Sequence, residues 1–395
     1  MRSKPLTRRD AMFTAGAVFG AAALQACSAS LGPLTPDDAR RRVATGDERE
    51  PIPSGAPPIV QALSFGLHAP SPHNTQAWRF RLLSDREAAF YVDRERLLPR
   101  TDPPARQIHI GCGCFAEAFA LGASRLGHAS RVELFPAGPY ASDADIGHVP
   151  VARLSLSQAA PASPDPLADW IEARQTSRLV YGGEPVGEAE IARVIADAGL
   201  RHARASLVPA RALAEHIALF DAAMTRETNT RATNEETRRW FRFDDDALAT
   251  KRDGFGFAAN GVTGIKGMFA RWMVSDTEES WNSPGTIDKA LSGFREAIAS
   301  ARGVVLLSTD ANERTDQLET GRDVYRLLLS LTKHGYAAHP LTQVTQEYEE
   351  MKDLRERLDS LTGVRAPAKV QMILRIGKSE VPWRSYRRRL RDMIA

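Results

Sequence analysis

A loop rich in proline and in hydrogen-bonding side chains occupies residues 69–80, with the sequence Ala-Pro-Ser-Pro-His-Asn-Thr-Gln-Ala-Trp-Arg-Phe. Its candidate binding residues are Pro70, Ser71, Pro72, Asn74 and Gln76. One hydroxyl and two carboxamides offer donors and acceptors for the polar edge of a planar heterocycle, and the prolines hold the backbone close to the face of such a ring. The loop therefore predicts a site for a planar heterocycle; the alternative is a chance turn before a strand.

Cationic and hydroxyl side chains alternate farther along the chain, at Arg174, Thr176 and Arg178. Alternate side chains of an extended segment point to the same side, so these three would form one cationic, hydroxyl-bearing edge. Such an edge fits a phosphate group. Arginine pairs also commonly form a solvated face, so this group alone leaves both interpretations open.

Both groups resemble motifs of the nitroreductase family. Residues 70–78 resemble the family's Pro-Ser-x-x-Asn-x-Gln-Pro-Trp loop, with Ala77 in place of the usual proline. Residues 174–178 are similar to the Arg-Arg-Ser-x-Arg motif that begins nitroreductase domains. The resemblance implies a bound FMN, with the first arginine and the hydroxyl contacting the cofactor and the last arginine near flavin N1 and O2.

Residues 335–343, Gly-Tyr-Ala-Ala-His-Pro-Leu-Thr-Gln, are similar to a third family segment. In nitroreductases this segment passes over the flavin and presents backbone amides near N5. The resemblance implies that Leu341, Thr342 and Gln343 lie at the cofactor. The alternative is an ordinary connection between a helix and a strand.

The C-terminal residues 371–390 look like the family's closing strand, glycine turn and basic phosphate contact. The resemblance implies that Arg387 and Arg389 form the basic pair and that Arg388 faces away. Arginine runs near chain ends also occur without any ligand, so a plain basic tail is the alternative.

The two halves of the chain lack different parts of this site. The first half has the Ser/Asn loop but no Arg-x-Thr-x-Arg segment, whereas the second half has the arginine motifs but reads Ala-Gly-Leu-Arg-His-Ala at 198–203, where its own loop would follow a helix. Homodimeric nitroreductases build each FMN site from both subunits. The resemblance therefore implies a monomer in which two fused half-units form a pseudo-dimer with one FMN, as in the Acg-like branch of the family.

Apolar periodicity predicts the elements that must position these motifs, in an α+β fold of the nitroreductase-like type. In the first half, 57–158, it predicts helices at 59–68 and 106–127 and strands at 78–83, 88–93, 130–135 and 149–156. After a linker at 159–166, the second half, 167–395, has predicted helices at 167–174, 188–197, 211–240, 315–334 and 346–361 and strands at 205–208, 303–308 and 368–376. The stretch at about 241–290 combines glycine with aromatic residues, which favours a lid over a pocket.

The N-terminus reads as a targeting segment. Arg8 and Arg9 precede a short, small-residue-rich apolar run that ends at Cys27. This pattern predicts a twin-arginine signal peptide at 1–27, and Leu-Gln-Ala-Cys resembles a lipoprotein cleavage box. We expect a periplasmic or lipid-anchored protein with a tether at 28–56; simple cleavage or an uncleaved anchor are the alternatives.

Charge and cysteine content argue against several other classes of protein. The first 26 residues hold four of the 52 basic residues and one of the 49 acidic residues, so the remainder has 48 of each and gives no reason to expect nucleic acid. Three cysteines cannot form a disulfide framework, and the pair at Cys112 and Cys114 has no accompanying His/Cys cluster for a metal.

The sequence thus predicts an FMN-dependent oxidoreductase that passes a hydride to a nitroaromatic, quinone or similar small molecule, with NAD(P)H as the candidate donor. No catalytic acid or base is assigned, because the flavin carries the chemistry; His73 and His339 each lie beside a proline and are expected to be structural. Two alternatives stay open: an exported FMN store with a lidded site and no turnover, and an interaction module without a cofactor.

Overall fold

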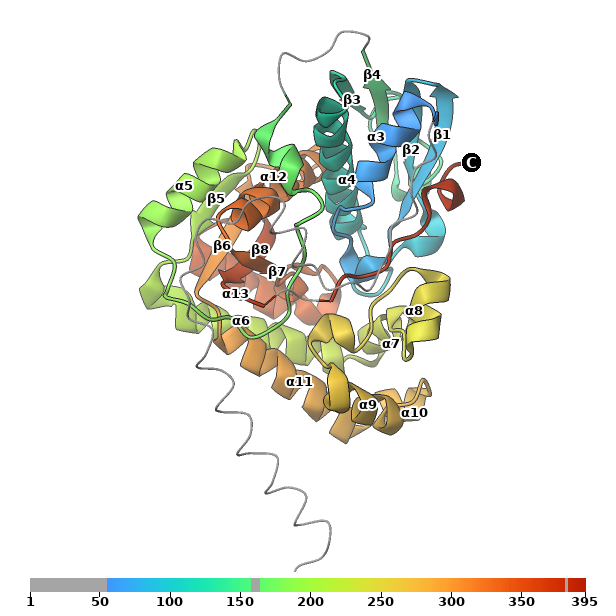
Figure 1. Cartoon of the computed structure of the whole chain (residues 1–395). Coiled ribbons are helices and arrows are strands. Elements are labelled where there is room, and N and C mark those ends of the chain that lie inside the picture. The colour runs from blue at the N-terminus through green and yellow to red at the C-terminus, as the bar shows by residue number, and fades with distance from the viewer. Residues whose placement is uncertain (1–54, 158–163, 381–382) are drawn as a thin grey trace, which may run out of the picture. The chain divides into compact units, whose positions relative to one another are not determined.

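The structure, a computed structural model, describes residues 55–157, 164–380 and 383–395 (Figure 1). The predicted signal peptide, nearly all of the predicted tether and most of the linker between the halves lie outside these ranges. Within them, no helix combines the length and the apolar character that a bilayer crossing requires.

The first half is a four-stranded antiparallel sheet with two helices. Its elements are α3 (Pro58–Gly66), β1 (Trp78–Ser84), β2 (Glu87–Val92), α4 (Arg106–Arg125), β3 (Ser130–Leu134) and β4 (Ala152–Leu156), and the strand order is β1-β2-β4-β3. Alternating burial along β1 places Trp78 and Phe80 in the core, where their rings lie 4.8 and 4.9 Å from that of Phe115 in α4. Each element corresponds to one that periodicity predicts.

The second half contains another four-stranded antiparallel sheet, with the order β5-β6-β8-β7. Its elements are α5 (Glu188–Ala198), β5 (Arg204–Leu207), β6 (Gly303–Thr309), α12 (Arg314–Lys333), β7 (Ala337–Pro340), α13 (Lys352–Thr362) and β8 (Lys369–Gly377). Six further helices lie between β5 and β6: α6 (Ala210–Asn229), α7 (Arg231–Trp240), α8 (Asp245–Lys251), α9 (Gly264–Met273), α10 (Glu278–Trp281) and α11 (Pro284–Ala299). The first half has only a short turn at the corresponding place, between β1 and β2.

The two halves repeat one topology and meet through equivalent helices. In each half a helix precedes the first strand and a long helix follows the second, and the strand orders match. The long helices α4 and α12 cross at Gly113 and Gly321. A Cβ on Gly113 would lie 2.0 Å from the backbone oxygen of Leu318, and a Cβ on Gly321 would lie 2.0 Å from that of Ile110. This reciprocal contact is what a two-fold arrangement produces, and the fold is the α+β pair of fused half-units that the sequence predicts.

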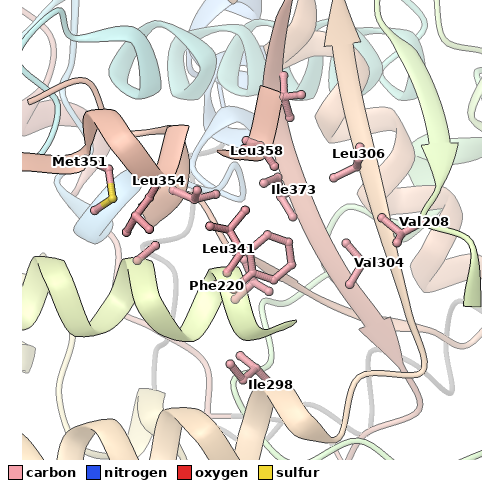
Figure 2. Packing of buried hydrophobic residues seen from close by; sticks show 14 of the residues in the cluster. Val208, Phe220, Ile298, Val304, Leu306, Leu341, Met351, Leu354, Leu358 and Ile373 are labelled. Carbon is pink, nitrogen blue, oxygen red and sulfur yellow. The ribbon is translucent and has the colours of Figure 1, made fainter. Parts of the chain in front are cut away.

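The apolar core of the second half fixes the segment that follows β7 (Figure 2). Phe220 of α6, Ile373 of β8 and Leu354 of α13 enclose Leu341, which is 1% exposed. Since packed interiors resist displacement, the residues on either side of Leu341 are held at fixed positions.

Local differences from the predicted elements have local causes. The predicted helix at 167–174 is a 3-10 helix over Pro166–Trp170, followed by a turn at residues 171–173. The predicted helix at 211–240 is interrupted at Thr230, whose backbone is extended and whose hydroxyl donates to the oxygen of Arg226. Strand β7 is too short, and too close to a proline, to give a strand pattern.

Candidate functional site

Two contiguous spaces lie where the halves meet. The larger, of about 730 Å³, is called the large cavity; it is bordered by the loop at 70–73, the start of α4, the helices α6, α7, α9, α10 and α11 and residues 339–346. The smaller, called the basic pocket, is lined by residues 68–74, 172–178, 255–259 and 383–387. Both include Pro70, Ser71, Thr176, Arg178 and Phe255 in their walls. The large cavity has the volume typical of a small-molecule site, and its walls are mainly apolar.

The basic pocket brings together arginines from separate segments. Arg174 and Arg178 come from the stretch before α5, and Arg384 and Arg387 from the C-terminal segment. The one acidic side chain in its wall, Glu172, is paired with Arg125 at 2.8 Å. Such a concentration of guanidinium groups suits a phosphate or another multivalent anion.

Several donors in this pocket have no acceptor among the described residues. The Nε atom of Arg174, the amide of Gln175 and the Nε1 atom of Trp383 are buried and make no hydrogen bond. Arg174 itself is 6% exposed; its Nη2 donates to the backbone oxygen of His68 at 2.9 Å, and its Nη1 donates to the Thr176 hydroxyl at 3.5 Å. Leaving buried donors unpaired costs about 1–3 kcal/mol each, so a ligand with hydrogen-bond acceptors would be stabilised by these groups.

Arg178 lies at the junction of the two spaces. It makes no hydrogen bond or ion pair with another described residue, and its guanidinium lies 5.8 Å from the ring centre of Phe255. Burial lowers the pKa of Arg178 to about 10, so it stays charged at neutral pH. Arg174, Thr176 and Arg178 all line the basic pocket, but so does Gln175, which strict alternation would place on the other side; Ser177 contacts Ser379 through its hydroxyl.

The loop at 69–76 has a strained backbone that its own side chains stabilise. His73, Asn74 and Gln76 have φ angles of 47°, 52° and 51°, in the left-handed region that non-glycine residues rarely occupy. The hydroxyl of Ser71 accepts the backbone N–H of Gln76 at 2.8 Å and lies 3.2 Å from the hydroxyl of Thr75. Pro70, Ser71 and Pro72 border the large cavity.

The two carboxamides of this loop bind protein groups. Asn74 Nδ2 donates to the backbone oxygens of Gly254 and Tyr386 at 2.8 and 3.1 Å, and its Oδ1 accepts from Arg387. Gln76 Nε2 donates to the oxygen of Arg252 at 2.9 Å, and its Oε1 accepts the backbone N–H of Arg388 at 2.7 Å. Asn74 still borders the basic pocket, but Gln76 borders neither space. These amides therefore hold the walls of the site together. The sequence predicts that they face a ligand, but in the structure their hydrogen bonds go to protein groups.

The C-terminal segment crosses from the second half to the first. The backbone N–H of Phe80 donates to Met393 at 2.7 Å, and that of Ala395 donates to Phe80 at 2.8 Å, so the tail runs along β1. Arg387 is 8% exposed and lines the basic pocket.

The expected orientation of the next two arginines is wrong. Arg388 faces inward, where it donates to the backbone oxygen of Gln76 at 3.0 Å and pairs with Asp93 at 3.2 Å. Arg389 is exposed and borders neither space, so the structure does not bring it to the other candidate residues. The reason is the pairing of the tail with β1, which the sequence of the tail does not encode by itself.

The segment after β7 reaches the large cavity from the opposite side. Thr342 and Gln343 line it, and the Thr342 hydroxyl donates to Oε1 of Gln107 in α4 at 3.0 Å. Leu341 does not line it, because its side chain belongs to the apolar core of the second half.

Two histidines in the cavity wall are neutral. Burial and the charge of Arg178 lower the pKa of His73 to about 4, and its Nε2 lies 3.1 Å from the Thr237 hydroxyl. Burial and the nearby Arg375 lower the pKa of His339 well below its ordinary value, and Arg375 Nε donates to its Nδ1 at 3.0 Å. These contacts fit the structural role that the sequence predicts for both.

Sequence reasoning missed several residues in the walls. Trp383 and Gln175 carry unpaired buried groups, and neither belongs to a motif. Glu227 of α6 is 6% exposed, lines the large cavity and accepts from Gln346 Nε2 at 2.6 Å. Burial and the nearby Glu236 raise the pKa of Glu227 to about 7. Phe255 and other residues of 241–290 line the large cavity, and the lid that the sequence favours for this stretch stays a prediction.

The symmetry-related position in the second half holds ion pairs. Residues 201–203, which follow α5 as the Ser/Asn loop follows α3, donate three backbone N–H groups to Asp323 at 2.7 to 2.9 Å. Glu117 of α4, 1% exposed, pairs there with Arg201, Arg322 and Arg326. Charged side chains that satisfy one another occupy this place; that only the other position forms a complete site stays a prediction.

The thiols do not form a reactive centre. Burial raises the pKa of Cys112, and it raises that of Cys114, which lines the large cavity, to about 12. Over the described ranges no group of histidine, cysteine and carboxylate side chains could hold a metal.

The chain is similar in sequence to mycobacterial proteins of comparable length. It is 26% identical over 329 residues to "Putative NAD(P)H nitroreductase acg" of Mycobacterium tuberculosis, covering 81% of this chain and 88% of that protein. It is 25% identical over 324 residues to "Putative NAD(P)H nitroreductase Rv3131" of the same organism, covering 81% and 84%. No protein-family model matches the chain.

Solved structures show weaker likeness. A nitroreductase-type protein from Anabaena variabilis aligns with 83% of this chain and 90% of its own, with a TM-score of 0.39 and 11% identity. The FMN-dependent nitroreductase NfnB of Mycobacterium smegmatis, solved with NADPH, aligns with 53% of this chain and 86% of its own, with a TM-score of 0.34 and 17% identity.

Proposed function

We propose that this chain binds one FMN where its halves meet and acts as an NAD(P)H-dependent oxidoreductase on a nitroaromatic, quinone or similar acceptor. The observation that carries the proposal is the junction of two unlike spaces: a basic pocket with unpaired buried donors opens into a larger apolar cavity. A flavin mononucleotide has the same two parts, a phosphate and an apolar ring system. The names of the mycobacterial relatives support the same activity.

The residues present fit this cofactor. Arg174, Gln175 and Trp383 supply the unpaired donors that a phosphate would accept. Pro70 and Pro72 offer flat apolar contacts for a ring, and Thr342 and Gln343 line the same cavity. FMN bound there would supply hydride transfer at N5.

Arg178 has the clearest role of the chain's own residues. A cation at the junction of the two spaces, with no protein anion beside it, favours a ligand that gains negative charge on reduction. Phe255, Phe257 and other aromatic residues of 241–290 supply part of the apolar wall of the large cavity. In the overall reaction, NAD(P)H loses one hydride, and a quinone gains that hydride and one proton from solvent to become a quinol.

The test is the absorbance spectrum of the purified full chain, followed by titration with FMN. We expect the visible bands of a flavin and one FMN per chain. Arg174→Gln should lower the affinity for FMN about tenfold or more, since a charge-assisted hydrogen bond contributes about 1.5–3 kcal/mol. Arg389→Gln is the matched control, because Arg389 is exposed and outside both spaces. A folded protein that stays colourless and takes up no FMN contradicts the proposal.

A second candidate is an FMN store without turnover. The hydrogen bond from Asn74 to Gly254 ties the segment 241–290 to the flavin-side loop, and Phe241 packs on Phe257 and Trp281 with ring centres 4.9 and 5.0 Å apart. A segment held in this way would shut out substrates. Bleaching of the flavin bands by NADPH under anaerobic conditions supports the enzyme, whereas bleaching by dithionite alone supports the store.

We also propose export by the twin-arginine route, with attachment through a signal anchor or a lipid on Cys27. The paired arginines and apolar run in the sequence support this. Replacing Arg8 and Arg9 with lysine should leave the protein in the cytoplasmic fraction. An unchanged distribution between fractions argues against the route.

A further inference from the structure

The helix α9 exposes a continuous apolar face. Ile265, Met268, Phe269 and Trp272 follow the spacing that places side chains on one side of a helix, and they are 72%, 65%, 55% and 82% exposed. Met273, 54% exposed, extends this surface, which we call the α9 face. Single exposed apolar residues are ordinary, but five on one short helix form a patch of the kind that marks a docking surface.

The charged residues of α9 and of the sequence immediately around it are all positive. Between Asp253 and Asp276 the sequence contains no acidic residue, while Lys266 and Arg271 lie on α9 and are exposed. Arg271 is paired with Asp245 of α8 at 2.7 Å. A short helix with tryptophan and phenylalanine on one face and cations beside them has the composition of helices that lie in the headgroup region of a bilayer.

The α9 face also adjoins the large cavity. Ile265, Phe269 and Met273 are exposed to solvent and at the same time line that cavity. The cavity therefore opens beside the apolar face, so a molecule leaving an apolar phase at α9 would reach the apolar interior directly.

We propose that the α9 face docks on the surface of a lipid bilayer, and that the acceptor is an apolar quinone that enters the large cavity from that bilayer. The docking stands on the surface of α9 alone. The delivery of the quinone rests on the oxidoreductase function proposed above.

A bilayer fits the rest of the chain better than a second copy does. The sequence carries a short apolar run at residues 11–26, after Arg8, Arg9 and Asp10; retained as a signal anchor, or replaced by a lipid on Cys27, it would attach the chain to a bilayer. Residues 28–54 connect this run to the described part and can span at most roughly 90 Å. A weak interfacial helix acting together with a second attachment is the usual requirement for stable membrane binding.

The docking is tested with the full chain and vesicles that contain phosphatidylcholine, phosphatidylglycerol and a brominated phospholipid. Bromine atoms quench tryptophan fluorescence at short range, and Trp272→Phe keeps the face apolar while it removes the reporter. We expect the wild type to lose more fluorescence than Trp272→Phe. Trp240→Phe, which removes a half-buried tryptophan of α7, is the control and should quench as the wild type does. Because this measurement needs no flavin, it is informative even if the proposed function fails.

Two results overturn the docking. One is equal quenching of the wild type and Trp272→Phe. The other is a particle mass of two chains in which Trp272 is shielded from the brominated lipid, which would assign the α9 face to a second copy.

The delivery of the quinone is tested with the double variant Met268→Ser/Trp272→Ser, whose two positions do not line the cavity. We expect kcat/KM to fall about tenfold or more for a long-tailed quinone dissolved in vesicles, since burying two large apolar side chains contributes several kcal/mol. The same quinone without its tail should be reduced at an unchanged rate. Leu83→Ser/Leu126→Ser, at exposed apolar positions of the first half, is the control and should change neither rate. Equal loss for both quinones, or loss for neither, overturns the delivery.

Discussion

The carboxamide of Asn74 and the guanidinium of Arg387 lie 313 positions apart in sequence and share a hydrogen bond of 2.6 Å. Both residues line the basic pocket, together with Arg174. Arg387 also donates from Nε to the backbone oxygen of Leu67, at the end of α3, at 2.9 Å, and from Nη2 to that of Ala69 in the loop at 3.3 Å. The loop of the first half and the C-terminal segment of the second half therefore form one wall, so the site exists only where the two halves are folded together.

Asn74→Ala should destabilise the folded chain by about 2–4 kcal/mol. It removes the acceptor of Arg387 and the donor to the oxygens of Gly254 and Tyr386, in a buried place with a φ of 52° that asparagine tolerates better than alanine. Denaturant unfolding of the cofactor-free chain measures this difference. Asn229→Ala, at the exposed end of α6, should change stability by less than about 0.5 kcal/mol. Equal effects of the two variants would mean that the Asn74 contacts contribute little.

Arg178→Met should stabilise the chain without cofactor and weaken FMN binding. A cation with no anionic partner among the described residues, held where burial lowers its pKa to about 10, disfavours folding until a ligand arrives. We expect a gain of about 1 kcal/mol in the free energy of unfolding and a loss of about tenfold or more in FMN affinity. The two measurements are unfolding of the cofactor-free protein and titration with FMN. A loss of stability together with unchanged affinity would assign Arg178 a purely structural role.

The sequence predicts the elements of this fold better than it predicts the direction of particular side chains. Periodicity places β1, β2 and α4 within a few residues, because their burial patterns are local. Alternation groups Arg174, Thr176 and Arg178, which do line one pocket, although Gln175 between them lines it too. That prediction needs no knowledge of the rest of the chain.

Predictions that depend on distant partners were less accurate. The carboxamides of Asn74 and Gln76 turn toward the C-terminal segment and residues 252–254, and no local pattern encodes those partners. The pairing of the C-terminal segment with β1 turns Arg388 inward and Arg389 outward. Their roles, and the assignment of the other candidate residues to FMN, remain predictions.

Gly113→Ala should strongly destabilise the chain. Its new methyl group would meet the backbone oxygen of Leu318 at 2.0 Å, and a backbone atom cannot move aside as a flexible side chain can. The crossing of α4 and α12 would have to open, at a cost of about 3 kcal/mol or more. Thermal unfolding and FMN content are the measurements, since the same crossing aligns the two halves of the site.

Gly293→Ala in α11 is the matched control, because a Cβ there would meet nothing within 4 Å. Alanine in a helix interior is more favourable than glycine by about 1 kcal/mol, so this variant should be slightly more stable than the wild type. Similar behaviour of the two variants would contradict the tight crossing.

Glu227→Gln should change how stability depends on pH. Burial, together with Glu236, raises the pKa of Glu227 from 4.5 to about 7, although the hydrogen bond from Gln346 opposes the shift. Because the folded state keeps this proton more tightly than the unfolded state does, the contribution of Glu227 is fully present below pH 4.5. It falls as pH rises to about 7 and is constant above that.

The wild type should therefore lose up to about 3 kcal/mol between pH 4.5 and pH 8 relative to Glu227→Gln, since one pKa unit corresponds to about 1.4 kcal/mol. The measurement is denaturant unfolding of both proteins across that range, with Glu215→Gln, at an exposed position of α6, as the control that should run parallel to the wild type. Parallel curves for the wild type and Glu227→Gln would show that Glu227 ionises in the folded cavity as readily as it does in the unfolded chain.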